Sequence, residues 1–301
     1  MTLVTGEPRC LVAQGDWCGE GATWSADEGA IYWTDINRFL IHRHRLQDGA
    51  TRSWLFDEPV VALSLTDDPD CMLVALGSKL IFWKPESDER RDQGFALEGF
   101  PEVRFNDGRS DPHGTFWIGS MGNNVGADGE EQELHDGLGR FFSVRAGEDP
   151  REWRQGIGIV NTLCWSPDGR RFYTGDTLAN EIRAYDVDPD TGDISGERPH
   201  FRGFDRGLPD GSAIDVDGYL WNCRYGGGCI VRIAPDGSID RVIDMPVRNI
   251  TTCAFAGDDL STLLVTTASM GRAKGDRLAG SLFAIETNTK GLPENRFRHR
   301  K

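Results

Sequence analysis

The sequence has little of what several common protein classes require. It contains no run of 18 or more consecutive apolar residues, so it offers no membrane-spanning helix. The N-terminus, MTLVTGEPRCLV, has no basic segment followed by an apolar one, which argues against a secretory signal. Convincing amphipathic helices are also missing, and this excludes doubly wound and TIM-barrel folds. We therefore expect a soluble, unexported, cytoplasmic protein that does not act at a membrane.

Positive charge is scarce as well. The chain has 48 acidic and 33 basic residues, for a formal net charge of -15, and no stripe rich in Lys and Arg. A nucleic-acid backbone would be repelled by such a chain. Nucleic acid is therefore not an expected partner.

The residues of several common catalytic centres are also missing. The chain contains no GxSxG and no HExxH motif, and its six histidines are predicted to lie at the surface, His42 and His44 on one face of an outer strand. A Ser-His-Asp triad or a histidine-rich zinc centre therefore lacks parts. The seven cysteines form no CxxC pair, which argues against a disulfide framework and a zinc finger and favours buried, reduced thiols.

What the sequence does contain is a repeat. Residues 160–177, VNTLCWSPDGRRFYTGDT, predict a β-hairpin with a Ser-Pro-Asp-Gly turn between two strands. Each variant of this hairpin belongs to a unit of three or four short strands, and the units recur at a period of about 40 to 55 residues, which is typical of propeller blades. The six units are centred on residues 19–49, 60–84, 104–120, 160–177, 209–237 and 250–268.

These units predict an all-β protein, a single six-bladed β-propeller domain over residues 1–301 with a metal site at its centre. Residues 1–15 are expected to supply the outer strand of the last blade and so close the ring. A polar insertion, 121–136, interrupts the third unit. The polar tail 287–301 is predicted to be a frayed terminus.

Aligning the units on their turns shows which residues are special. Asn161 lies eight residues before the turn glycine Gly169, and Asp210 lies eight before Gly218. Asn106 has the same spacing in the third unit, and Glu20 has it with one extra residue. The second and sixth units have Val61 and Thr251 at this position. Four of the six repeats therefore place a carboxylate or a carboxamide at the start of the innermost strand.

Innermost strands line the channel of a propeller, so equivalent positions on them converge at the axis. Glu20, Asn161 and Asp210 would offer three oxygen donors with a total charge of -2, which suits one divalent cation, Ca²⁺, Mg²⁺ or Mn²⁺, with Zn²⁺ also possible. The alternative is that these residues begin turns or hydrate a wet channel.

The motifs also carry a family resemblance. GEGATW, RFNDGRSDPHGTFWIGSM, NTLCWSPDG, LPDGSAIDVDGYLW and AGSLFAI resemble, in order and over nearly the whole chain, the gluconolactonase and regucalcin family, also called the senescence marker protein family. The resemblance implies a six-bladed propeller that holds one divalent metal and hydrolyses sugar lactones to aldonic acids. Its metal ligands fall on Glu20, Asn161 and Asp210, the positions that the alignment of units selects.

The resemblance further implies a substrate site. The family's Arg-x-Asn-Asp motif falls on Arg104, Asn106 and Asp107, and Asn123 lies in the insertion that is expected to form part of the pocket rim. Two departures stand out: Thr162 follows Asn161 where many members have glycine, and residues 122–124 lack a carboxylate that some members place there. These departures bear on substrate preference more than on reaction type.

The implied chemistry is metal-assisted hydrolysis of a small-molecule sugar lactone. The metal would polarise the lactone carbonyl, Asp210 is the first candidate for the general base that activates water, and Asp107 is the second. Two other functions stay open, a metal-dependent phosphotriesterase and a calcium-binding regulatory propeller without catalysis. The sequence leaves open the sugar, the native metal and the oligomeric state.

Overall fold

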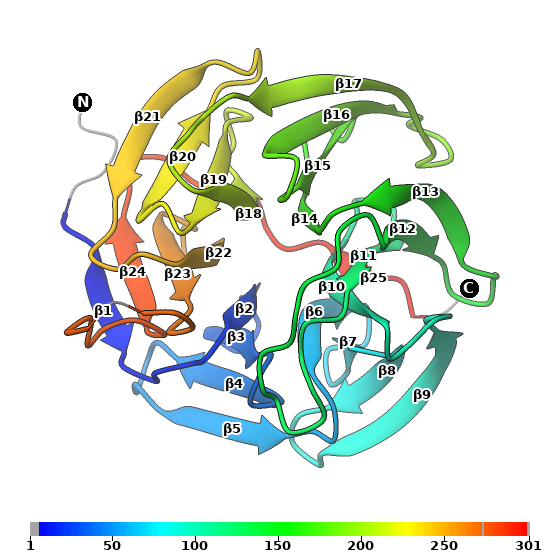
Figure 1. Cartoon of the computed structure of the whole chain (residues 1–301), viewed down its shortest axis with the longest axis horizontal. Coiled ribbons are helices and arrows are strands. Elements are labelled where there is room, and N and C mark those ends of the chain that lie inside the picture. Colours follow the sequence, from blue (N-terminus) through cyan, green and yellow to red (C-terminus); the bar gives the residue numbers. More distant parts are fainter. Residues whose placement is uncertain (1–5, 273, 300–301) are drawn as a thin grey trace.

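The computed structural model describes residues 6–272 and 274–299. In this part of the chain, 25 strands form six sheets arranged around a central axis like the blades of a propeller (Figure 1). The neighbouring strands of each blade are antiparallel, and the first strand of every blade lies nearest the axis. The predicted all-β, six-bladed propeller is confirmed.

The first three blades follow one another along the chain. Blade one contains β2 (Gly19–Ser25), β3 (Ala30–Asp35), β4 (Leu40–Arg45) and β5 (Thr51–Leu55). Blade two contains β6 (Val60–Thr66), β7 (Met72–Leu76), β8 (Lys79–Lys84) and β9 (Glu89–Ala96). Blade three contains β10 (Val103–Ser110), β11 (Phe116–Gly122), β12 (Gly139–Val144) and β13 (Arg151–Ile157).

The other three blades complete the ring. Blade four contains β14 (Val160–Trp165), β15 (Arg171–Asp176), β16 (Glu181–Val187) and β17 (Ile194–Arg202). Blade five contains β18 (Leu208–Ile214), β19 (Leu220–Tyr225), β20 (Cys229–Ile233) and β21 (Ile239–Asp244). Blade six contains β22 (Ile250–Ala256), β23 (Thr262–Thr267) and β24 (Leu282–Glu286), with β1 (Arg9–Val12) as its outer strand.

Both ends of the described chain are built into the ring. Arg9 in β1 pairs with Ala284 in β24, so a strand from the start of the chain completes the last blade. At the other end, β25 (Arg296–Phe297) pairs in parallel with β6 of blade two. The prediction of a frayed tail is therefore wrong for residues 287–299, and residues 300–301 lie outside the described part.

The tail is held by contacts that its polar composition does not reveal. It crosses from blade six to blade two on the side of the ring where the β14–β15 and β18–β19 turns lie, and the backbone N–H of Val216 donates to the carbonyl of Lys290. The side chain of Asn295 donates to the carbonyl of Ser110, and Phe297 is fully buried. One aromatic residue and a set of backbone hydrogen bonds thus fix a segment that is otherwise polar.

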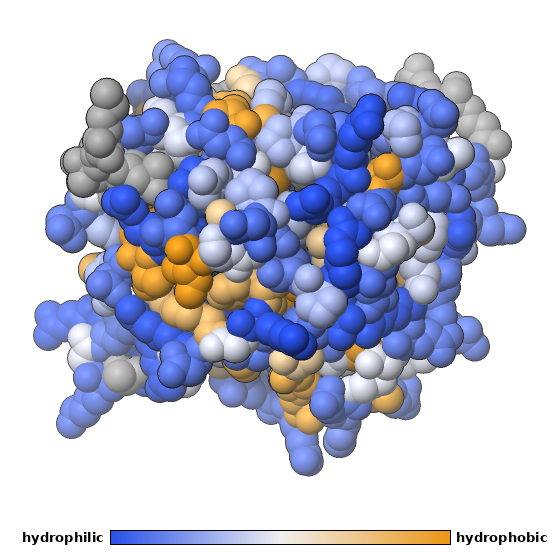
Figure 2. All heavy atoms as spheres, turned by 90° about the horizontal axis from the view of Figure 1, so that it is seen from above, coloured by the Kyte–Doolittle hydropathy of each residue, from blue (hydrophilic) through white to orange (hydrophobic). Residues whose placement is uncertain are grey.

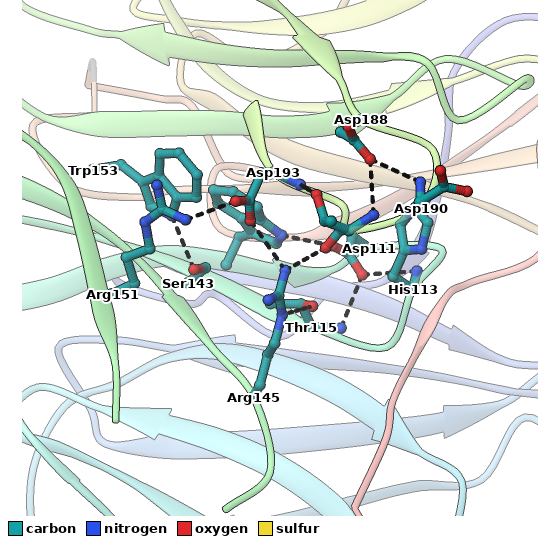
Figure 3. Close-up of polar contacts among 12 residues, drawn as sticks. Asp111, His113, Thr115, Ser143, Arg145, Arg151, Trp153, Asp188, Asp190 and Asp193 are labelled. Atoms are coloured by element: carbon teal, nitrogen blue, oxygen red, sulfur yellow. Dashed lines mark hydrogen bonds and ion pairs between the residues drawn. The ribbon is translucent and has the colours of Figure 1, made fainter. Parts of the chain in front are cut away.

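Two of the hairpin turns are closed by a buried aspartate. In blade three, Asp111 accepts the backbone N–H groups of His113 and Thr115, both at 2.8 Å, and the indole N–H of Trp117 at 2.8 Å (Figure 3). The sequence of this turn, DPHGTFW, recurs in blade five as DVDGYLW. There Asp215 accepts the equivalent bonds, including one from the indole of Trp221 at 3.0 Å. Each aspartate therefore shapes its turn and orients a core tryptophan.

Blades three and four are also joined by ion pairs near this turn. Arg151 pairs with Asp193 of the β16–β17 loop at 2.8 Å, and Arg145 donates to the carbonyl of Thr191 at 2.6 Å (Figure 3). Exposed pairs of this kind contribute little to stability. The main contact between these blades is apolar, because Trp117 and Phe141 of blade three pack against Phe172 of blade four.

Two of the six histidines differ from the prediction. His42 is fully buried and His44 nearly so, because β4 lies between β3 and β5 rather than at the edge of its blade. His42 Nδ1 bonds Ser53 at 2.7 Å, and its Nε2 lies 3.1 Å from Asp16. Burial of an imidazole is possible here because both ring nitrogens have polar neighbours.

The outer surface is mainly polar. Figure 2 shows a side of the molecule on which hydrophilic residues predominate around a limited hydrophobic area. Exposed large hydrophobic residues occur on several blades, among them Leu55 of blade one and Ile239 and Val242 of blade five. Within the described residues, no helix is long and apolar enough to cross a membrane.

Candidate functional site

A β-bulge occurs in the inner strand of every blade, next to the position that the alignment of units selected. The strand register shifts between Glu20 and Thr23, Val60 and Ala62, Phe105 and Gly108, Asn161 and Cys164, Pro209 and Ser212, and Ile250 and Cys253. A bulge adds a residue to one strand and re-aims the side chains beside it. At one end of the channel, the bulges thereby take the equivalent side chains of all six blades out of the regular alternation of their strands.

Thr162 shows what this geometry demands of the backbone. Its φ is 56°, in the left-handed region, and Gly21 in blade one has a φ of 60° after Glu20. Glycine adopts such angles freely, whereas a β-branched residue is strained there. The Thr162 hydroxyl donates to the carbonyl of Asp210 and lies 3.0 Å from the hydroxyl of Ser212. Threonine in place of glycine therefore strains the backbone, but its hydroxyl links blades four and five by hydrogen bonds.

A chain of side-chain hydrogen bonds joins three blades at this end of the channel. The amide of Asn106 donates to Oδ1 of Asn161 at 3.1 Å, and the amide of Asn161 donates to the hydroxyl of Thr177 at 2.8 Å. Thr177 donates in turn to the carbonyl of Pro209, next to Asp210, at 2.8 Å. The chain fixes the orientation of Asn161 and turns its oxygen toward Asn106.

Three carboxylates converge beside these amides. The carboxyl groups of Glu20 and Asp210 lie within hydrogen-bonding reach of each other, and the charge of Asp107 acts on both. Burial raises the pKa of Glu20 and of Asp210 well above their ordinary values. The charges of Asp210 and Asp107 raise the pKa of Glu20 further, whereas that of Asp210 is raised by Asp107 and lowered by its hydrogen bond with Glu20. A cation placed between these groups would relieve the repulsion among their charges.

Asp107 differs from the other two carboxylates in its partners. Burial raises its pKa, while the nearby guanidinium of Arg109 and the backbone N–H groups of Gly108 and Thr162 act in the opposite direction. Arg109 in turn donates to the carbonyl of Ser212 at 2.9 Å. Asp107 is thus partly neutralised by the protein itself.

Arg104 is a buried residue of this site, although its position on a strand also allowed a surface placement. It donates to the side-chain oxygen of Asn106 at 2.9 Å and to that of Asn124 at 2.8 Å. Burial lowers its pKa to about 10, so the guanidinium stays charged at neutral pH. The structure thus brings Arg104, Asn106 and the carboxylates into one polar cluster.

Asn123 and Asn124 occupy different places. The side-chain oxygen of Asn123 accepts the backbone N–H of Val125 at 3.0 Å, and the residue lines a cavity of about 940 Å³ between the insertion and blades one to three. Its role in substrate binding stays a prediction. Asn124, which the sequence did not single out, is the neighbour that contacts Arg104. The adjacent asparagines could not be told apart without the backbone of the insertion.

A second buried group was not predicted. Asp16, Asp35 and His42 each place a potential metal-binding atom within 4.8 Å of the others. Asp16 also accepts the indole N–H of Trp33 at 2.7 Å, and Arg38 pairs with Asp35 at 2.6 Å. Because Arg38 already supplies a cation to these carboxylates, the group serves to fix the backbone before Glu20.

Comparison with known proteins places this arrangement in a family. Residues 18–269, which include all of the converging side chains, match the model of the SMP-30/Gluconolactonase/LRE-like region. The chain belongs to this family. An L-arabinolactonase from Azospirillum brasilense is 33% identical over 97% of this chain and 96% of its own length. A pentonolactonase from Haloferax volcanii is 31% identical over 92% of this chain and 94% of its own length.

A solved structure of the SMP-30/gluconolactonase family matches the whole propeller. A regucalcin from Agrobacterium tumefaciens, described as a calcium-binding protein, superposes with a TM-score of 0.89 at 29% identity and covers 96% of this chain and 97% of its own. The family resemblance inferred from the motifs is therefore confirmed.

Proposed function

We propose that this protein is a divalent-metal-dependent sugar lactonase that hydrolyses an aldonolactone to the aldonic acid. The observation that carries the proposal is the convergence of Glu20, Asp107 and Asp210 at the end of the channel, next to Asn161 and Arg104. Related proteins named as an arabinolactonase and a pentonolactonase support the substrate class.

The residues fit a divalent cation by the chemistry of their donors. Glu20 and Asp210 offer hard carboxylate oxygens and Asn161 offers a carboxamide oxygen, a set that suits Ca²⁺, Mg²⁺ or Mn²⁺ and also Zn²⁺. Both carboxylates are buried and both are repelled by the charge of Asp107, which is the physical reason to place a cation there. When bound, such an ion supplies Lewis-acid polarisation of the lactone carbonyl.

The remaining steps belong to the protein side chains. Arg104 donates hydrogen bonds to the hydroxyl and ring oxygens of the lactone and so orients it. The amide of Asn106 already donates to Val160 and Asn161, so its side-chain oxygen accepts a hydrogen bond from a lactone hydroxyl. Asp210 accepts a proton from the attacking water, since burial and the charge of Asp107 raise its pKa well above the ordinary value, which makes its carboxylate a stronger base. Asp107 is the second candidate for this role. Fixed donors and charges of this kind stabilise the transition state without reorganisation.

The experiment is to follow proton release from a panel of γ- and δ-aldonolactones. Metal-stripped protein is compared with protein given Ca²⁺, Mg²⁺, Mn²⁺ or Zn²⁺, and spontaneous ring opening is subtracted. Turnover that requires metal and is lost in Asn161→Ala supports the proposal, and the panel identifies the sugar. Turnover that survives metal removal contradicts the metal requirement.

One alternative has a specific observation in its favour. The regucalcin that superposes on this chain is described as calcium-binding, so a calcium-binding role without catalysis is the second candidate. Tight Ca²⁺ binding without turnover of any lactone in the panel would favour it. The substrate-orienting groups Arg104 and Asn106 favour the enzyme, because a pure calcium site does not need them.

A further inference from the structure

The insertion between β11 and β12 forms an ordered hairpin. Backbone bonds of 2.9 Å join Gln132 to Asn124 and Gly126 to Glu130, and Val125 pairs with Glu131 as an isolated bridge. In Figure 1 this segment leaves blade three, passes in front of blade two and reaches blade one. Residues 123–136 are called the cross-blade hairpin below.

The cross-blade hairpin is fastened at both ends. At its root, Asn124 accepts hydrogen bonds from Arg104. At its tip, the amide of Asn37 in blade one donates to the carbonyl of Gly129 at 2.7 Å. Gly129 has a φ of 82°, and a Cβ at this position would lie 1.9 Å from the carbonyl oxygen of Asn37, so glycine is required there. The hairpin is therefore docked on blade one.

A third contact places the cross-blade hairpin next to the carboxylates. The indole N–H of Trp17 donates to Oε1 of Glu131 at 3.1 Å, across 114 residues of sequence. The backbone N–H groups of Trp17 and Cys18 donate to the carboxylate of Asp35 at 2.9 and 3.1 Å. These bonds fix Trp17 three residues before Glu20, so the hairpin is tied to the strand that carries a predicted metal ligand.

The charge of Glu131 also acts on Tyr225 of blade five. Tyr225 pairs with Leu208 at the end of the β18–β19 ladder, two residues from Asp210. Burial raises the pKa of the Tyr225 phenol, and the charges of Cys18, Asp210 and Glu131 raise it further. Trp17, Glu131 and Tyr225 therefore approach the mouth of the channel from blade one, the cross-blade hairpin and blade five.

We propose that Trp17 and Glu131 are specificity-determining residues that hold the cross-blade hairpin as a fixed wall of the mouth and select uncharged sugar lactones over lactones bearing an anionic group. This inference rests on the proposed lactonase function. Trp17 acts as a positioning residue through its bond to Glu131. Glu131 adds a negative charge at the mouth above the carboxylates of the axis, so a phosphate or carboxylate on the substrate meets repulsion there.

The positional role is tested with Trp17→Phe, which keeps an aromatic ring and removes the indole donor. We expect the KM for glucono-1,5-lactone to rise about fivefold, with kcat changed by less than about twofold, because one hydrogen bond to a charged group is lost. A protease that cleaves after glutamate should cut the hairpin faster in this variant. The control is Trp153→Phe, which removes an indole bond of 2.9 Å to Ser143 on the outer part of blade three.

The role of the charge is tested with Glu131→Gln, which keeps an oxygen acceptor for Trp17 and removes the charge. We expect kcat/KM for 6-phosphoglucono-1,5-lactone to rise about three- to tenfold relative to that for glucono-1,5-lactone, more at low salt than at high salt. The control is Glu133→Gln, the same charge change on the same hairpin, at a residue that lines the outer cavity of about 940 Å³.

The outcomes separate this inference from the proposed function. The inference is overturned if Trp17→Phe and Trp153→Phe have the same KM and cleavage rate, or if the two glutamine variants change the preference for the charged lactone equally. If the unaltered protein hydrolyses no lactone, the lactonase function and with it the proposed selectivity are wrong. The cleavage rates then still decide whether Trp17 holds the hairpin.

Discussion

Buried carboxylates occupy both ends of the channel wall, and the two ends differ in how many hydrogen-bond donors the carboxylates have. At the turn end, Asp215 accepts backbone N–H groups, the indole of Trp221 and the guanidinium of Arg232, the last at 2.6 Å. At the other end, Glu20 and Asp210 face each other. Each carboxylate accepts a backbone hydrogen bond from the next residue along the chain, Gly21 or Gly211. Saturated carboxylates stabilise a fold, whereas carboxylates left short of partners are poised for a ligand.

Replacing Asp210 tests the unsaturated end and should have the largest effect. We expect Asp210→Asn to lower kcat by a factor of about 10² to 10⁴, because a proton acceptor and a charged metal donor are lost together. Its thermal midpoint without metal should stay the same or rise, since the burial of a carboxylate and its repulsion by Asp107 are removed. Steady-state kinetics and thermal unfolding of metal-free protein check both. A clear fall in the thermal midpoint of metal-free Asp210→Asn would contradict the view that this carboxylate does not stabilise the fold.

Replacing Asp215 tests the saturated end. We expect Asp215→Ala to lower the free energy of unfolding by about 3 to 5 kcal/mol, since it leaves the buried indole of Trp221 without an acceptor and Arg232 with Asp240 alone. The kcat per folded molecule should be unchanged. Urea unfolding and kinetics at low temperature measure the two effects, and Asp215→Asn, which keeps one acceptor oxygen, should be intermediate. Loss of kcat in folded Asp215→Asn would mean that the carboxylate at the turn end also contributes to catalysis.

Thr162 lies next to the converging carboxylates and tests how much its hydroxyl and its strained backbone each affect stability. Thr162→Val keeps the branched shape and the strained φ but removes the hydroxyl that contacts Asp210 and Ser212. We expect a loss of about 1 to 3 kcal/mol in the free energy of unfolding, because buried polar groups lose a partner. Chemical denaturation measures it. Thr162→Gly, which also relieves the strain, should be less destabilised, and the opposite order would show that the left-handed backbone is not strained.

His200 tests how burial shifts the pKa of a group that lies away from the converging carboxylates. Burial, together with Arg171 and Arg198, lowers its pKa to about 4, and Asp236 opposes this shift only weakly. The unfolded chain therefore takes up the proton first, so stability is lost as the pH falls from about 6.5 toward 4 and levels off below that. We expect a loss of about 1 to 2 kcal/mol after allowance for solvent screening. Urea midpoints from pH 7.5 to 4 should fall less steeply in His200→Gln, and equal slopes would contradict the shift.

The repeat carried most of what the sequence could predict. The turn motifs defined six hairpins, and counting back from their glycines selected Glu20, Asn161 and Asp210 as equivalent positions. In blade one the bulge after Glu20 is marked by Gly21, but the bulge after Asn161 has no such signal, because Thr162 occupies a left-handed angle that glycine would normally mark. Spacing could therefore identify the site residues without showing how the strand presents them.

Contacts over long sequence distances were beyond prediction. Trp17 and Glu131 meet across 114 residues, and neither lies in a motif. The polar tail appeared frayed because Phe297, its buried anchor, is surrounded by charged residues in the sequence. His42 appeared exposed because the alternation within a strand does not show which strand of a blade it belongs to.

The pairing of β1 with β24 also bears on how the protein is made. Arg9 leaves the ribosome long before its partner Ala284 has been synthesised. Until then, β1 and the incomplete sixth blade keep open strand edges, which are prone to pairing with other chains. Such distant pairing also slows folding in the test tube. The nascent chain is therefore most vulnerable to aggregation until β24 has been made, because five blades can form by then but the ring cannot close.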